Sequence, residues 1–318
     1  MDIKKIGIAT TALLLCANLP MQTHAMAAES KQVYTTKAES KLKSNLEEGQ
    51  GSFLDVTDYF SVVPGKSSSI DKNIVTITPD QKQQVGGLWS DSTNKVNLTK
   101  NFHLEANLYM GANQNGADGM AFVMQNDPRG NSALGQLGGA LGIYGSNFVQ
   151  NALAVEFDTY YNEDMDRDVV PNREHMAITI PSADSTLTHH ALNILPEGVH
   201  FADGNEHLVV FDWDAATKTL SYSYQGYTGS YQVQDLQATF GSSEVIFGFT
   251  GSTGSEKNLQ KLKITELQIN GISPELALEI NDTKGNNNGK AEPSETVSVK
   301  NTISNATDDA TSFKMEYG

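Results

Sequence analysis

The stretch Ala154–Asn162, which reads AVEFDTYYN, decides the fold because it passes from a strand into a polar loop. Val155 and Phe157 alternate in it with Glu156 and Asp158. Successive side chains of a strand point to opposite faces, so the apolar residues can enter a core together. The stretch therefore predicts a strand that buries one apolar face and carries two carboxylates on the other.

The loop after this strand is rich in oxygen ligands. Asn162, Asp164, Asp166 and Asp168 follow one another closely, and His175 opens the next apolar run. Carboxylates that share a small volume raise each other's pKa, so a cation is needed to keep them all ionised at neutral pH. Oxygen ligands suit Ca²⁺, and an added histidine suits a transition ion such as Mn²⁺. The sequence predicts these ions here, and the alternative is an acidic loop that stays in solvent.

The composition is typical of a secreted protein. The 318-residue chain has a net charge of −16, which argues against nucleic acid as a partner. Residues 1–25 resemble a secretory signal, with a basic start and an apolar segment too short to span a bilayer comfortably, and they contain Cys16, the only cysteine. Residues 26–50 read as a flexible lead-in. We expect a secreted, extracellular chain, free or associated with a cell surface, without membrane insertion.

The remainder reads as short strands separated by turns. Phe102–Met110 alternates apolar and polar residues, whereas Met120–Met124 is continuously apolar and predicts a strand buried on both faces. Regularly spaced strands with turn signals predict a β-sandwich. We expect it to cover residues 51–272, because Pro274 marks a boundary. Residues 273–318 are then a linker or the start of a second, small β module.

Four motifs resemble, in order, those of the legume-type (L-type) lectins and their bacterial surface relatives. They are GADGMAF at 116–122, GGALG at 138–142, VEFDTYYN at 155–162 with His175, and GFTGSTG at 248–254. The resemblance implies an all-β, concanavalin-like jelly-roll β-sandwich followed by a short partial β module. It further implies a calcium-dependent carbohydrate-binding module of a secreted or surface bacterial adhesin. Its partners would be glycans of host or bacterial surfaces, and it would not be an enzyme.

The resemblance also assigns a sugar site. Asp118, reached through a cis Ala117–Asp118 peptide, would accept hydrogen bonds from sugar hydroxyls. Gly138 or Gly139 would donate a backbone N–H, and we favour Gly139. Asn162 would turn its amide nitrogen to the sugar and its oxygen to calcium. The remaining residues that the resemblance places against the sugar are Tyr160, through its ring, and Ser255 and Glu256, which would set the identity of the sugar.

The metal residues follow in the same way. Glu156 and His175 would hold the transition ion, Asp158 would bridge both ions, and the Tyr160 carbonyl would join Asn162 on calcium. The family has one more aspartate that touches both ions. Here Asp164, Asp166 and Asp168 all qualify, and we favour Asp168. The alternative is a site that keeps calcium only, as in bacterial relatives.

Two other functions compete with sugar binding. A retaining glycoside hydrolase needs two carboxyl groups about 5–5.5 Å apart. Glu156 and Asp158 could lie near that distance, but both look committed to metal, and Tyr161 stands where the related hydrolases have a third acidic residue. A structural stalk or protein-binding module is the other alternative, and the set Asp118, Gly139 and Asn162 argues against it. The particular sugar and the oligomeric state stay open.

Overall fold

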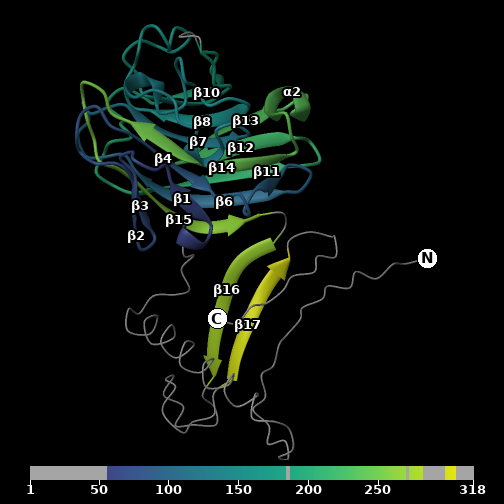
Figure 1. Cartoon of the computed structure of the whole chain (residues 1–318). Coiled ribbons are helices and arrows are strands. Elements are labelled where there is room, and N and C mark those ends of the chain that lie inside the picture. The colour runs from purple at the N-terminus through teal and green to yellow at the C-terminus, as the bar shows by residue number, and fades with distance from the viewer. Residues whose placement is uncertain (1–55, 184–186, 270–271, 282–297, 306–318) are drawn as a thin grey trace, which may run out of the picture. The chain divides into compact units, whose positions relative to one another are not determined.

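The structure is a computed structural model that describes residues 56–183, 187–269, 272–281 and 298–305. The expected signal and lead-in, residues 1–50, lie outside the described residues. The chain divides into two compact units, and residues 54–271 form the larger one. Figure 1 shows this unit as two stacked sheets. It is an all-β jelly-roll sandwich, so the expected fold class is confirmed.

The first sheet carries the candidate site, and all of its neighbouring strands are antiparallel. A short strand, β5 (Val96–Asn97), pairs with β14 (Glu244–Ser252) outside the main strand order. The order across the sheet is β1 (Phe60–Val62), β4 (Val85–Ser90), β14 (Glu244–Ser252), β7 (Gly119–Gln125), β8 (Ala152–Asp158), β9 (His175–Thr179) and β10 (His190–Ile194).

The second sheet is also antiparallel and backs the first. Its order is β13 (Tyr227–Gln232), β12 (Thr219–Tyr224), β11 (His207–Asp214), β6 (Phe102–Tyr109), β15 (Gln260–Gln268), β3 (Ile74–Thr78) and β2 (Ser69–Asp71). The short helices are η1 (Val56–Asp58), η2 (Gly130–Ser132), η3 (Gly138–Ala140) and α2 (Leu236–Phe240). Within the described residues, no helix has the length and apolar character needed to cross a membrane.

The main core is aromatic. The ring of Phe122 on β7 stacks on that of Phe211 on β11 at 4.2 Å between centroids, and Phe249 meets Phe122 edge-on at 5.5 Å. Burying one such side chain stabilises the fold by about 1.5–3 kcal/mol. Val155 and Phe157 of β8 belong to this core, as the alternation in the sequence predicts.

A second core covers the opposite face of the first sheet. Ala154 and Val123 pack there with Leu141 and Tyr144, which come from the segment between η2 and β8. Both faces of β7 and β8 are therefore buried, which confirms the expectation for Met120–Met124. As a consequence, Glu156 lies on a covered face rather than in solvent.

The second unit contains β16 (Ile272–Asn281) and β17 (Ser298–Asn305), which pair in an antiparallel two-stranded sheet. The residues between these strands lie outside the described part of the chain.

Candidate functional site

β8 and β9 together deliver the first group of site residues. Their register places Asp158 opposite His175, and Glu156 shares the face of Asp158 because it lies two residues away. Asp158, Asp166 and His175 each offer a ligand atom, and these atoms lie within 4.8 Å of one another. All three residues are buried. The sheet register, completed by the loop after β8, thus creates a compact group of carboxylates beside an imidazole.

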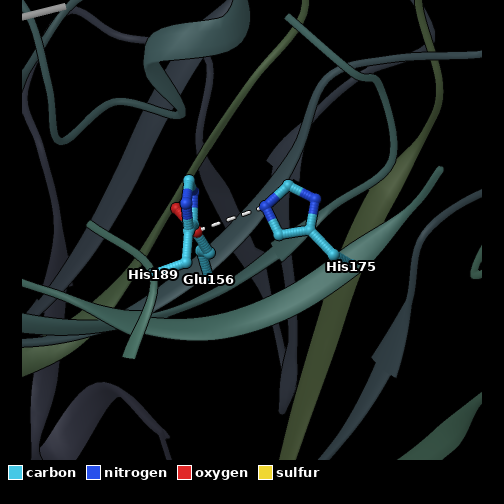
Figure 2. A group of neighbouring side chains, drawn as sticks. All are labelled: Glu156, His175 and His189. Atoms are coloured by element: carbon cyan, nitrogen blue, oxygen red, sulfur yellow. Dashed lines mark ion pairs between the residues drawn. The ribbon is translucent and has the colours of Figure 1, made fainter. Parts of the chain in front are cut away.

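A second group adjoins the first and shares His175 with it. Glu156, His175 and His189 offer ligand atoms within the same 4.8 Å limit. Figure 2 shows the His175 ring turned toward Glu156, with the His189 ring seen edge-on beside the carboxylate. Nε2 of His175 lies 3.4 Å from Oε1 of Glu156, and Nε2 of His189 lies 3.0 Å from the same oxygen. Sequence reasoning missed His189, although a histidine just before an apolar run is the signal that pointed to His175.

The other oxygen of Glu156 is already bound. Tyr144 donates its hydroxyl hydrogen to Oε2 of Glu156, and the hydroxyl also lies 2.6 Å from Oγ1 of Thr179. Burial, followed by the charge of Glu156, raises the pKa of Tyr144 well above its ordinary value. Tyr144 therefore stays protonated and leaves only Oε1 of Glu156 for another partner.

Several buried atoms of this cluster have no hydrogen bond within the described residues. They are Oε1 of Glu156, both ring nitrogens of His175 and Nε2 of His189. A buried polar atom without a hydrogen bond costs about 1–3 kcal/mol, and a cation held by Oε1 of Glu156, Nε2 of His189 and one ring nitrogen of His175 would offset this cost. Two imidazoles with carboxylates fit a transition ion. The oxygen atoms of Asp158, Asp166 and Asn162 fit calcium.

The electrostatics of the cluster fit a bound cation. Burial raises the pKa of Asp158 well above its ordinary value, and Asp166 and Glu156 raise it further. Burial also raises the pKa of Asp166. Burial would likewise raise the pKa of Glu156, but the two histidines outweigh it and lower that pKa to about 2. Positive charge near these carboxylates would thus favour their ionised forms.

The structure separates the three candidate aspartates of the loop. Asp166 joins Asp158 and His175, whereas Asp168, whose side chain is 44% exposed, pairs with Nδ1 of His189 at 2.5 Å. Asp164 is exposed. The cause is a tight turn, in which the backbone N–H of Asp166 donates to the carbonyl of Asn162 at 2.8 Å. The chain therefore returns to the cluster at Asp166, and Asp168, which we favoured from the sequence, lies behind His189.

A third set of residues meets at the neighbouring surface. The Ala117–Asp118 peptide bond is cis, as the resemblance implied. Oδ2 of Asp118 and Oδ1 of Asn162 are buried without a hydrogen bond. A Cβ atom on Gly139 would lie only 2.1 Å from that Asn162 oxygen. Burial raises the pKa of Asp118 to about 7 against a hydrogen bond from the backbone of Gly254.

The other predicted residues lie around this set. The carbonyl of Gly138 accepts a 2.5 Å hydrogen bond from Ser252. Tyr160 is 41% exposed, and its backbone N–H donates to Oδ1 of Asp158 at 2.7 Å. Ser255 is exposed and Glu256 is half-buried, directly after Gly254. The structure therefore brings Asp118, both glycines and Asn162 together. It also connects Tyr160 to the metal cluster. Ser255 and Glu256 are near this set because they follow Gly254 in the chain.

Comparison with known proteins gives a family match and several relatives. The model of the legume lectin beta-barrel domain matches residues 53–266. The serine-rich adhesin for platelets of Staphylococcus aureus strain USA300 is 24% identical over 279 residues, which cover 80% of this chain and 11% of the adhesin. The adhesin of the same name from strain MRSA252 is 24% identical over 271 residues, or 78% of this chain and 18% of the adhesin. The chain thus spans less than a fifth of these relatives.

Solved structures resemble the sandwich as well. The lectin from Bauhinia forficata in complex with GalNAc has a TM-score of 0.53 at 18% identity and covers 65% of this chain and 90% of its own. Lectin I-B4 from Griffonia simplicifolia, in its metal-free form, has a TM-score of 0.52 at 19% identity. The match covers 68% of this chain and 94% of that lectin. At these identities the likeness shows the fold alone. Because the family match covers more than half of the chain, the protein belongs to the L-type lectin family.

Proposed function

We propose that the sandwich is a calcium-dependent carbohydrate-binding module of a bacterial adhesin. The observation that carries this is the convergence of Asp118, Gly139 and Asn162, with buried oxygens of both side chains unpartnered. Sugar hydroxyls are donors and acceptors at once, so a carboxylate, an amide and a backbone N–H side by side suit them. A purely structural module has no use for such unsatisfied atoms.

Calcium is proposed to lie beneath the sugar, held by Asp158, Asp166, the Asn162 amide oxygen and the Tyr160 carbonyl. This set contains oxygen ligands only, which is what calcium prefers. The bound ion supplies fixed positive charge to the buried carboxylates. The Asn162 amide is proposed to connect the two sites, with its oxygen on calcium and its nitrogen donating to the sugar. A transition ion is proposed beside it at Glu156 and His175.

The partners are proposed to be glycans outside the cell, on host or bacterial surfaces. The staphylococcal relatives are adhesins for platelets, and the Bauhinia forficata lectin was solved with GalNAc. GalNAc-terminated glycans are therefore the first probes to use. Exposed Tyr160 offers its ring to the apolar face of a sugar, and Ser255 and Glu256 are proposed to discriminate between sugars.

A catalytic role finds less support. Glu156 and Asp158, the pair that a retaining hydrolase would use, are only 1% and 3% exposed. Glu156 is occupied by Tyr144 on one oxygen and faces two histidines with the other. Carboxylates in that position have no access to a glycosidic bond, so we propose that the module binds without catalysis.

A glycan array tests the proposal. The full chain is applied with calcium and with a chelator, together with the variants Asp118→Ala and Asn162→Ala. Hydrogen bonds to a charged acceptor are worth about 1.5–3 kcal/mol each, so Asp118→Ala should erase detectable binding while calcium binding persists. Asn162→Ala should lose the sugar and weaken calcium together.

Asp71→Ala serves as the control, because Asp71 is an exposed carboxylate on β2 of the second sheet. It should bind as the wild type does. Wild-type glycan binding by Asp118→Ala would contradict the proposed site. Equal binding with calcium and with chelator would contradict the calcium dependence.

A further inference from the structure

His189 is held in one orientation by Asp168. Nδ1 of His189 lies 2.5 Å from Oδ1 of Asp168, and the backbone N–H of His189 donates to Oδ2 at 3.1 Å. The His189 side chain has no exposed surface. A carboxylate on one ring nitrogen fixes the ring and leaves the other nitrogen as the ligand, which is the common arrangement of metal-bound histidines.

The nitrogen left over points into the metal cluster. Nε2 of His189 lies 3.0 Å from Oε1 of Glu156 and 3.7 Å from Oδ1 of Asp166, yet it makes no hydrogen bond. The rings of His175 and His189 have centroids 4.9 Å apart and stand at 86° to each other. The two nearly perpendicular rings thus both place Nε2 within 3.4 Å of Oε1 of Glu156 (Figure 2).

We propose that His189 is a direct metal ligand positioned by Asp168, and that the set Glu156, His175 and His189 binds zinc in preference to manganese. A second imidazole changes the character of the site, because nitrogen ligands suit zinc whereas manganese is best served by oxygen. Zinc is commonly bound by two histidines and a carboxylate, with a further ligand completing four. Asp166 lies close enough to complete this set.

The two neighbouring ions would then be distinguished by the ligands that each prefers. The oxygen-rich group around Asp158 and Asn162 suits calcium, and the nitrogen-containing group suits zinc. The inference rests on the metal cluster of the proposed function but requires no bound sugar, so the two can fail separately.

A metal competition tests the inference on the full chain, prepared without a polyhistidine tag. The chain is stripped with a chelator and dialysed against equal concentrations of zinc and manganese with excess calcium, and its metal content is then measured. Because most sites of nitrogen and oxygen ligands prefer zinc to manganese, the quantity to compare is the ratio of the two affinities, which should be larger in the wild type than in His189→Ala. Cobalt substituted for zinc should give the strong visible absorption of a four-coordinate ion.

Variants then test the role of each residue. His189→Ala should lower zinc affinity by more than about 100-fold, and Asp168→Asn, which alters only the positioning, by about 10–100-fold. His190→Ala is the matched control, since His190 is the next residue and packs its ring on Tyr231 instead. It should bind zinc as the wild type does.

Three results would overturn the inference. Manganese retained in place of zinc by the wild type is one, and it needs no variant to fold. No transition metal in the wild type is the second. The third is zinc binding of wild-type strength by His189→Ala, which would make His189 a protonated partner of Glu156 and Asp168 rather than a ligand. If glycan binding with calcium persists in any of these cases, the proposed function stands and only this inference fails.

Discussion

The two ends of strand β7 handle a buried carboxylate in opposite ways. Asp127 lies two residues beyond one end and is 4% exposed, while Asp118 lies directly before the other end and is 5% exposed. Arg129 and a backbone N–H satisfy Asp127, with Nη2 of Arg129 2.6 Å from Oδ2. Asp118 has no such cation within the described residues, and its neighbour Asp166 has only histidine beside it, with Nε2 of His189 3.7 Å from Oδ1. One end of β7 therefore neutralises its carboxylate with an arginine, and at the other end Asp118 lacks a cationic partner.

The pKa values express the same contrast. Burial would raise the pKa of Asp127, but Arg129 and the backbone donors lower it overall. Burial raises the pKa of Asp118 to about 7, and the single hydrogen bond from Gly254 does not offset this. A stability measurement with and without metal should therefore distinguish the ends.

The largest effect on stability is expected at the end of β7 that carries Asp127. Asp127→Ala removes the acceptor of the Arg129 side chain and of the backbone N–H groups of Arg129 and Gln150, and each buried donor left without a partner should cost about 1–3 kcal/mol of unfolding free energy. The cost should be the same with calcium and with chelator, because no metal is involved. Urea unfolding in both buffers measures it. A cost that vanishes when calcium is removed would connect this end to the metal site and erase the contrast.

A smaller effect, dependent on metal, is expected at the other end. Asp158→Asn removes a charge that burial and its neighbours disfavour, so in chelator the variant should be at least as stable as the wild type. With calcium at 100 times its dissociation constant, the wild type should gain about 2.7 kcal/mol and the variant little of it. The same pair of urea titrations checks both statements. Equal destabilisation in the two buffers would show that Asp158 has a structural role only.

The pH dependence of the metal-free chain sharpens the comparison. The folded-state pKa of Asp118 is raised from 3.8 to about 7, so in this range the folded state binds the extra proton and stability falls as pH rises from about 4 to 7. Asp127 has a lowered pKa, so its contribution is present above pH 3.8 and is lost as pH falls through the folded value. Melting temperatures in chelator at pH 5 and pH 8 should show a smaller drop for Asp118→Asn than for the wild type. An identical drop in both proteins would contradict the shifted pKa.

The smallest effect is expected from shortening the chain. Residues 54–271 form a compact unit, so a chain of residues 51–272 should fold, bind calcium and bind sugar as the full chain does. Circular dichroism and the same glycan array measure this. Loss of folding or of binding would show that the later residues contribute to the sandwich.

The sequence was sufficient for those features that depend on local patterns. The alternation around Val155 and Phe157 predicted which face of β8 enters the main core, and the apolar run Met120–Met124 predicted a strand buried on both sides. These features depend only on the two-residue period of a strand.

The membership of the site depends on the path of the loops, which the two-residue period of a strand does not specify. Asp166 rather than Asp168 reaches the cluster because of a turn closed by Asn162. His189 arrives from a distant segment just before β10, and Tyr144 arrives from the loop that builds the second core. Sequence spacing alone gave no reason to join these side chains to Glu156.

Thermal unfolding of the full chain after chelation, and again after calcium is restored, tests the calcium dependence directly, with glycan binding followed in parallel. Chelation should lower the melting temperature and abolish glycan binding, and calcium should restore both, because an ion bound only by the folded state stabilises that state. Unchanged melting and unchanged glycan binding after chelation would contradict the calcium dependence.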